Sequence, residues 1–260
     1  MPSLQRAACV AALTALSCGP ASAQWQGSVG IGARSATHTE YGLAGRQLVR
    51  ENGWLPGASL DAGYRRGSLT WFGGADWYQG GIDYRGRTQA GSAAQSSTST
   101  RLASARLGAA ADWRSHAILA ALEIDHWKRD IHATAAAAGL QERYRSWRLL
   151  LGAGTSWRPA AGAVSLDAAA VLAAPERMRI GFSGLFDPVS LDTRRGHGLR
   201  LGAGIHPAWR PALQLRSRFD WLDVPRSGDA VLNANGAFRG TVTQAEHVRR
   251  ALTLELAAVF

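Results

Sequence analysis

Apolar and other residues alternate along most of this chain with a period of two, which is the pattern of β-strands. In the final segment Leu252, Leu254 and Leu256 fall on one face of a strand, and Thr253 and Glu255 fall on the other. The same alternation predicts an all-β chain of ten strands, at about residues 25–36, 57–65, 68–84, 99–113, 116–128, 144–157, 163–173, 197–206, 212–222 and 246–260.

The links between these strands fall into two length classes that alternate along the chain. Short links lie at 65–67, 114–115, 158–162 and 207–211, and long links at about 37–56, 85–98, 129–143, 174–196 and 223–245. Short periplasmic turns that alternate with long extracellular loops are typical of a transmembrane, antiparallel, up-and-down β-barrel. Both chain ends then lie on the turn side, which requires an even number of strands.

One segment leaves the strand count open. Residues 41–50 also have strand character, and we assign them to the first long loop. If that assignment is wrong, twelve strands are the next option and eight the one after.

Aromatic residues fall near both ends of the predicted strands. Trp147 and Trp157 share one face of a strand and are ten positions apart. At about 3.3 Å per residue and a tilt near 40°, this spacing is roughly 25 Å along the barrel axis, the height of the apolar band between two aromatic belts. The expected belts contain Trp71, Trp113, Trp157, Trp209 and Phe260 at the turn end, and Tyr84, Trp127, Trp147 and Trp221 at the loop end.

The other face of the predicted strands carries nearly all of the mid-strand charges. An Arg or Lys on the lipid face at mid-membrane costs about 2–4 kcal/mol, so we assign these charges to the lumen. The inward candidates are Asp61, Asp76, Arg106, Asp112, Glu123, Asp125, Arg148, Asp167, Arg200, Arg216, Arg218, Asp220, Arg249 and Glu255.

This inward set is mixed in sign, and a ten-stranded lumen is narrow enough for opposite charges to pair across it. The sequence therefore predicts a charge-plugged barrel. We expect Arg148 to pair with Glu123 or Asp125 on the neighbouring strand, within a luminal network of Glu123, Asp125, Arg148, Arg216, Arg218 and Asp220.

The first 23 residues have the features of a secretory signal peptide. Arg6 precedes an apolar stretch at 7–16, and the segment ends in the small residues Ala21-Ser22-Ala23. The apolar stretch is far shorter than the roughly 18 residues that a membrane-spanning helix needs. We therefore expect a leader at 1–23 and a single barrel domain at 24–260.

Composition narrows the chemistry that the mature chain can perform. Both cysteines, Cys9 and Cys18, lie in the expected leader, so we expect no disulfide, no cysteine metal site and no cofactor. The formal net charge is +10, and Lys128 is the only lysine. A basic chain can bind nucleic acid, but there is no recognisable binding fold and the charge is spread along the chain, so we expect no such partner. We expect arginines near the outer rim to contact lipopolysaccharide phosphates, which guanidinium groups bind bidentately.

Two short motifs are candidates for catalysis. Asp130-Ile131-His132 resembles one half of the omptin protease site, where a carboxylate-oriented imidazole takes a proton from water. Omptins also use a pair of acids across the cleft, for which this chain offers only Asp83. Lipid-modifying barrel enzymes use a serine with a histidine, and Ser115-His116 combines these residues in a predicted turn.

The long loops are the expected place for a specific function. The first carries several apolar residues at 48–57. The fourth contains an apolar group that we expect to form a lid over the barrel mouth or a partner-binding patch: Met178, Ile180, Phe182, Leu185 and Phe186.

Across its mature length the chain resembles bacterial outer-membrane β-barrel proteins. The features that carry the resemblance are Ala21-Ser22-Ala23, the alternating strands, the aromatic belts and the terminal Phe260. The resemblance implies export by a signal peptide, residence in the outer membrane of a Gram-negative envelope among lipid and lipopolysaccharide, and recognition of Phe260 by the barrel-assembly machinery. The expected function is structural or interactive, through the extracellular loops. A rim enzyme, protease or lipid-modifying, and a narrow channel are the alternatives. No external partner is identified.

Overall fold

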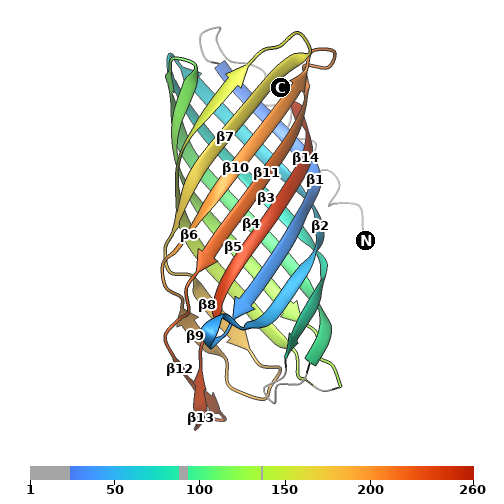
Figure 1. The fold of residues 1–260 in the computed structure, drawn as a ribbon, viewed down its shortest axis with the longest axis vertical. Helices are drawn as coiled ribbons and strands as arrows, with labels where there is room; N and C mark the ends of the chain where they lie inside the picture. The colour runs from blue at the N-terminus through green and yellow to red at the C-terminus, as the bar shows by residue number, and fades with distance from the viewer. Residues whose placement is uncertain (1–23, 88–92, 136) are drawn as a thin grey trace, which may run out of the picture.

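The computed structural model describes residues 24–87, 93–135 and 137–260. The predicted leader lies outside the described residues, as does part of the second loop. Ten long strands form a closed, antiparallel barrel (Figure 1). They are β1 (Gln24–Tyr41), β2 (Gln47–Arg66), β3 (Leu69–Arg87), β4 (Ala93–Trp113), β5 (His116–Ile131), β6 (Leu140–Trp157), β7 (Gly162–Ala173), β10 (Gly196–Pro207), β11 (Leu213–Val224) and β14 (Glu246–Val259). The predicted fold class and strand number are confirmed.

Short elements lie at the loop end of the barrel. They are a 3-10 turn η1 (Leu43–Gly45) and two hairpins, β8 (Arg177–Gly181) with β9 (Val189–Asp192) and β12 (Ala230–Ala234) with β13 (Ala237–Val242). No helix in the described part of the chain is long and apolar enough to cross a membrane.

The barrel closes where its first and last strands pair. β14 runs antiparallel to β1 over fourteen residue pairs, from Ser28 with Val259 to Tyr41 with Glu246. Beyond this ladder the backbone N–H of Gly27 donates to the carbonyl of Phe260 at 2.8 Å, and the N–H of Phe260 donates back at 2.9 Å. The ring of Phe260 covers Gly27, where a Cβ atom would collide with it. The terminal aromatic is therefore part of the seam.

The predicted strand boundaries are accurate at the turn end, and at the loop end they are too short for β1 to β6 but not for β7, β10 and β14. The predicted first loop, 37–56, is almost entirely strand, because β1 and β2 continue until only residues 42–46 link them. Residues 41–50 thus hold both the short link at 42–46 and the start of β2, and they add no eleventh strand. Strands β3, β4, β5 and β6 also continue past their predicted loop ends. Above the membrane the outward face no longer has to be apolar, so alternation no longer reveals these strand ends.

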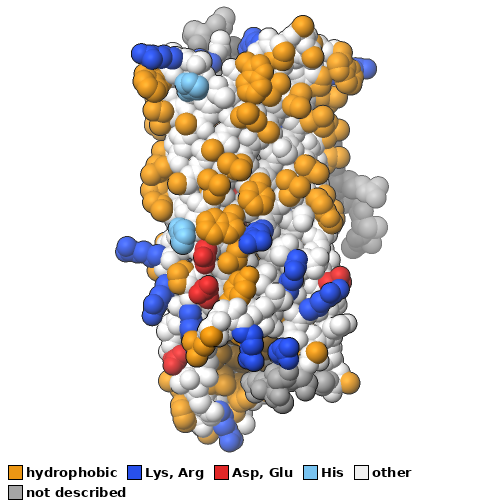
Figure 2. All heavy atoms as spheres, in the orientation of Figure 1, with side chains coloured by type: hydrophobic (Ala, Val, Ile, Leu, Met, Phe, Trp, Pro, Cys, Tyr) orange, Lys and Arg blue, Asp and Glu red, His pale blue; other side chains and the backbone are white. Residues whose placement is uncertain are grey.

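Outward side chains form an apolar band with tryptophans at both margins. Figure 2 shows this band on one face of the barrel, with basic side chains gathered below it towards the β12–β13 end. Exposed aromatics at the turn end are Trp25, Trp71, Trp113, Trp157, Trp209 and Phe260, and those at the loop end are Trp54, Trp77, Trp147 and Phe219.

Two residues assigned to the outer belt lie inside the barrel. Trp127 is buried, and its indole N–H donates to Thr100 Oγ1 at 3.0 Å. Its position has the same parity as the inward Glu123, so the alternation of the strand itself contradicts the belt assignment. Tyr84 likewise shares the parity of the inward Tyr78 and Ile82 and is only partly exposed.

The fourth loop continues the barrel wall instead of forming a simple lid. β8 pairs with the loop end of β6, from Gln141 with Gly181 to Arg145 with Arg177. The inward side chains Met178 and Ile180 are buried against Trp127 and Tyr144. Of the remaining apolar residues expected in the lid, Phe182 and Phe186 pack edge to face, and Leu185 is exposed.

Candidate functional site

Six arginines and six carboxylates meet in the middle of the lumen and form one connected set of ion pairs, which we call the luminal network. Its members are Arg34, Arg106, Arg148, Arg200, Arg216, Arg218, Asp61, Asp76, Glu123, Asp125, Asp220 and Glu255. Nine of the ten barrel strands contribute a member, the exception being β7. The charges balance within the set.

Several pairs join strands that are not neighbours in the wall. Arg200 on β10 reaches Glu123 on β5 at 2.8 Å, although β6 and β7 separate these strands. Arg218 on β11 reaches Asp76 on β3 at 3.1 Å. The network therefore connects opposite walls of the lumen.

The members predicted from the sequence all lie in this network. Arg148 pairs with both of its expected partners, Glu123 at 3.4 Å and Asp125 at 2.9 Å. Asp220 is 2.6 Å from Arg200 and 3.3 Å from Arg218. Each guanidinium has fixed donors in one plane, which suits it to bridge two carboxylates at once.

Inward glycines make room for these long side chains. A Cβ atom on Gly30 would collide with Ser59 Oγ and the guanidinium of Arg216. At Gly74 it would collide with the carboxylate of Asp61 and the guanidinium of Arg106. Glycine inside these strands thus permits a close approach of charged groups.

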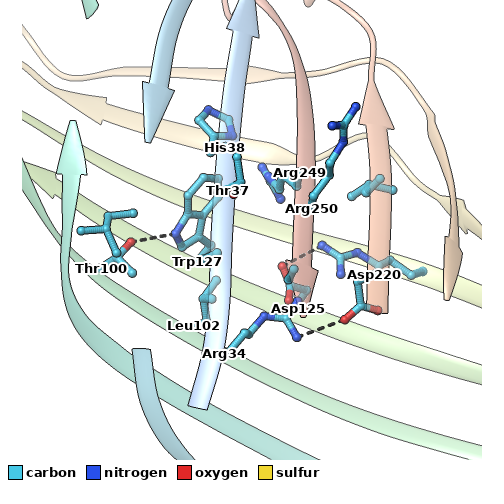
Figure 3. Close-up of a pocket in the computed structure, with 15 residues that line it drawn as sticks. Arg34, Thr37, His38, Thr100, Leu102, Asp125, Trp127, Asp220, Arg249 and Arg250 are labelled. Carbon is cyan, nitrogen blue, oxygen red and sulfur yellow. Dashed lines mark hydrogen bonds and ion pairs between the residues drawn. The ribbon is translucent and has the colours of Figure 1, made fainter. Parts of the chain in front are cut away.

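A small cavity of about 60 Å³ lies on the loop side of the network (Figure 3). Trp127, Leu102 and Ile82 form an apolar side of its lining, and the charged groups of Arg34, Asp125, Asp220 and Arg249 face it. Figure 3 shows the Arg34–Asp220 pair, 3.0 Å long, at one end and His38 at the other.

A larger space of about 330 Å³ lies on the turn side, and we call it the vestibule. One side of its lining is apolar, with Phe72, Leu119, Ala121, Leu150 and Ala169, and the other side carries arginines of the luminal network. The apolar side belongs to a buried cluster that continues along the inner wall to Leu222 and Val224. The network therefore lies between two separate spaces.

A second charged group closes the loop end, and we call it the mouth cluster. At its centre Arg129, fully buried, contacts three carboxylates: Glu40 at 3.2 Å, Glu51 at 2.9 Å and Glu142 at 2.5 Å. Tyr144 Oη donates to Glu142 at 3.0 Å. The outward neighbours of Arg129 on its strand are the polar Lys128 and Asp130, so this cluster lies above the apolar band.

Three acids around one guanidinium leave a surplus of negative charge at this site. Burial, together with the charges of Glu40 and Glu51, raises the pKa of Glu142 to about 7 in spite of Arg129. For Glu40 burial acts in the same direction, but the hydrogen bond from His38 and the charge of Arg129 outweigh it, and its pKa lies below the usual range. Burial and Arg129 lower the pKa of His38, which is consistent with a neutral imidazole that donates to Glu40.

A residue of the fourth loop ties that loop to β14. Glu176, which precedes β8, accepts two hydrogen bonds from Arg249 at 2.8 and 2.6 Å and lies 3.3 Å from His247. The guanidinium of Arg249 also lies over the ring of Trp127, 4.3 Å from its centroid. Such cation–π stacking is strongest in a desolvated position.

The predicted catalytic candidates do not face one another across the mouth. Asp83 and Asp130 occupy outward positions, because inward Ile82, Tyr84, Arg129 and Ile131 flank them. His132 lies on the same outer surface, with Ser97 Oγ 3.0 Å from Nδ1 and Ser99 Oγ 3.0 Å from Nε2. Both imidazole nitrogens are thus engaged by serines, and no carboxylate is hydrogen-bonded to His132 in the part of the chain that the structure describes.

The mouth cluster and Arg34 were missed by the sequence analysis. Glu40, Glu51, Arg129 and Glu142 lie in segments that were expected to be loops. The signal that could have found them is the inward parity of Glu123, Asp125 and Trp127, which continues directly to Arg129. Among the described residues no group of three or more His, Asp and Glu side chains is placed to hold a metal ion.

Comparison with solved structures agrees with the geometry. The chain superposes on the outer membrane protease OmpT from Escherichia coli with a TM-score of 0.58 and 10% identity, over 95% of this chain and 99% of that one. The chain has the outer-membrane β-barrel fold. Its similarity to the translocator domain of the autotransporter NalP from Neisseria meningitidis is weaker, with a TM-score of 0.48 and 9% identity over 89% of this chain and 88% of that one. No family model and no curated protein matches the sequence.

For a barrel of this fold the short turns face the periplasm and the loop end faces outward. The mouth cluster, the two short hairpins and the outward candidates Asp83, Asp130 and His132 are then extracellular. The vestibule lies on the periplasmic side of the luminal network.

Proposed function

We propose that this protein is an outer-membrane barrel, exported by its leader, that does not conduct and acts through its extracellular end in envelope structure or surface interaction. The observation that carries the proposal is the luminal network, because its ion pairs connect opposite walls at mid-barrel. A solute would have to break several buried pairs to pass, and each broken pair leaves an uncompensated charge in a poorly solvated space.

A rim protease is less well supported. Catalysis of the omptin type needs the acids and the histidine to face each other over a bound peptide. Asp83 and Asp130 point away from the mouth, and His132 is held by two serines.

Conductance in planar lipid bilayers tests the proposal. The refolded wild-type barrel should give no current steps at moderate voltage. The double variant Glu123→Ala with Arg200→Ala removes one cross-lumen pair together with both of its charges, and it should produce small steps.

A matched control uses an ion pair outside the network. Arg65 and Asp112 form a pair at the turn end that is partly exposed, so the double variant Arg65→Ala with Asp112→Ala also removes one charge of each sign. This control should stay silent. Conductance of the wild-type barrel would overturn the proposal in favour of a narrow channel.

A further inference from the structure

A row of four basic side chains crosses the outer wall of the barrel. Arg101 on β4 is the register partner of Lys128 on β5, Lys128 of Arg143 on β6, and Arg143 of Arg179 on β8. All four point outward, because each alternates with inward residues of its strand. Directly opposed residues on neighbouring strands are about 5 Å apart, so four like charges lie side by side.

A second basic row runs beside the first, one outward position closer to the apolar band. His126 on β5 is the register partner of Arg145 on β6, and Arg145 is the partner of Arg177 on β8. We call these seven residues the basic wall. Arg177 forms an ion pair with Asp192 at 3.7 Å, in which both side chains are more than half exposed.

The first row of the basic wall has no carboxylate partner for its charge in the part of the chain that the structure describes. Within the described residues no carboxylate lies within ion-pair distance of Arg101, Lys128, Arg143 or Arg179. Asp130 lies in the adjoining row, opposite Ser99 and Gln141. Like charges directly opposed across strands are destabilising, whereas the lumen of the same barrel pairs its charges closely. An arrangement of this kind is stable when an external anion binds to it.

The arginines of β8 are held on a rigid surface. The opposite face of the hairpin places Met178, fully buried, and Ile180 into the apolar cluster around Trp127 and Tyr144. Arg177 and Arg179 therefore do not move freely with a loop, and they extend the flat wall begun by β4, β5 and β6.

The depth of the basic wall identifies the layer of the membrane that it meets. Moving from the apolar band towards the loop end, the outward Ala103 on β4 is succeeded by the basic Arg101. On β5 the outward Ile124 is succeeded by His126 and Lys128. On β6 Arg145 comes two positions above the half-exposed Trp147. One such step along a tilted strand raises a side chain by about 5 Å. The basic residues thus begin at the level of lipid headgroups, directly above the acyl chains.

We propose that the basic wall binds a phosphorylated glycolipid of the outer leaflet, whose acyl chains lie along the apolar face below, on residues such as Leu122, Leu149 and Leu172. Guanidinium groups grip phosphate bidentately, and a headgroup with two phosphates can bridge both rows. This inference deepens the proposed envelope function. It concerns the outer wall only, so its failure is distinguishable from that of the conductance test.

The experiment measures retention of bisphosphorylated lipid A by the refolded barrel in detergent micelles, by native mass spectrometry. The quadruple variant of Arg101, Lys128, Arg143 and Arg179 to Gln should weaken binding by about 600-fold, since each basic residue near an anionic headgroup contributes roughly fivefold. Monophosphorylated lipid A should bind the wild type more weakly than the bisphosphorylated form. All four side chains point away from the lumen, so the variant should still show heat-modifiable gel migration.

A matched pair of double variants separates a specific site from general attraction. Arg143→Gln with Arg179→Gln removes two charges of the basic wall, and Arg158→Gln with Arg210→Gln removes two exposed charges from the periplasmic turns. Only the double variant Arg143→Gln with Arg179→Gln should weaken lipid A binding, by about 10-fold or more. An equal loss of lipid A affinity in both double variants, or wild-type affinity in the quadruple variant, would overturn the proposal. So would equal displacement of the lipid by inorganic phosphate at the same concentration, since that result indicates a small-anion site.

Discussion

Neutralising Glu123 should destabilise the barrel more than neutralising any exposed acid. The carboxylate of Glu123 is 1% exposed and binds two arginines, with Oε2 2.8 Å from Arg200 Nη1 and Oε1 3.4 Å from Arg148 Nη1. In the variant Glu123→Gln the amide keeps the size of the side chain but removes the charge. Its N–H₂ group also faces guanidinium donors that it cannot satisfy.

The size of this loss in stability depends on the ion pairs that Arg148 and Arg200 keep after the substitution. Removing one partner of a buried ion pair costs about 3–5 kcal/mol when the other charge is left alone. Arg148 keeps Asp125 at 2.9 Å, and Arg200 keeps Asp220 at 2.6 Å. Neither charge is fully orphaned, so we expect the lower end of this range, about 3 kcal/mol. At the exposed pair with Arg65, Asp112→Asn should cost only about 0.2–1 kcal/mol.

Equilibrium urea unfolding in lipid vesicles, followed by tryptophan fluorescence, measures both variants. The comparison is valid where the dependence on denaturant is unchanged, because the variants then differ in stability alone. If Glu123→Gln loses less than about 1 kcal/mol, or no more than Asp112→Asn, the reasoning fails. That outcome means that water or mobile arginines, not fixed ion pairs, compensate the charges of the lumen.

Two further predictions concern the extracellular end. The pKa of Glu142 in the folded barrel, about 7, lies above its usual value of 4.5, so folding favours the protonated form and stability should fall as pH rises through this window. The infrared band of a protonated carboxyl in the folded barrel should disappear as pH rises through about 7, and it should be missing throughout in Glu142→Gln; a band unchanged by the substitution contradicts the assignment. Met178→Ala should cost about 2–5 kcal/mol and expose the β8–β9 hairpin to protease, whereas Leu185→Ala, at an exposed position, should change neither stability nor cleavage.

The turn-end half of the barrel could be predicted from the sequence because lipid imposes a strict rule on it. Where one face meets hydrocarbon, every second side chain must be apolar, and the ends of β6 and β7 on either side of residues 158–161 were accurate. Outside the membrane the outward side chains no longer have to be apolar. In β4 the run Thr98-Ser99-Thr100-Arg101 still alternates inward and outward, but all four residues are polar. Its strand geometry is set by pairing with β3 and β5, which no local pattern reveals.

The mouth cluster could not be derived for a related reason. Glu40, Glu51 and Glu142 come from β1, β2 and β6, and they meet at Arg129 only once the register of every intervening strand is fixed. Members of the luminal network could be predicted because they lie where the alternation of inward and outward positions is clear, as with Glu123, Asp125 and Arg148. Parity assigns a residue to the lumen, whereas partners across the lumen depend on closure of the barrel.

Charge in this protein is segregated between interior and exterior, although it is spread evenly along the sequence. The luminal network, the mouth cluster with Glu176 and Arg249, and the luminal Asp167 together take eight of the 29 basic residues but eleven of the 19 acids. The rest of the chain, including Arg6 of the predicted leader, therefore holds 21 basic residues against eight acids. A net basic composition thus coexists with an interior that is slightly acidic. Electrostatic repulsion on such an exterior is relieved by a polyanionic surrounding. In the basic wall, Arg101, Lys128, Arg143 and Arg179 lie side by side, and no described carboxylate is within ion-pair distance of them. The phosphates of the outer leaflet supply the opposite charge in the layer where the wall begins.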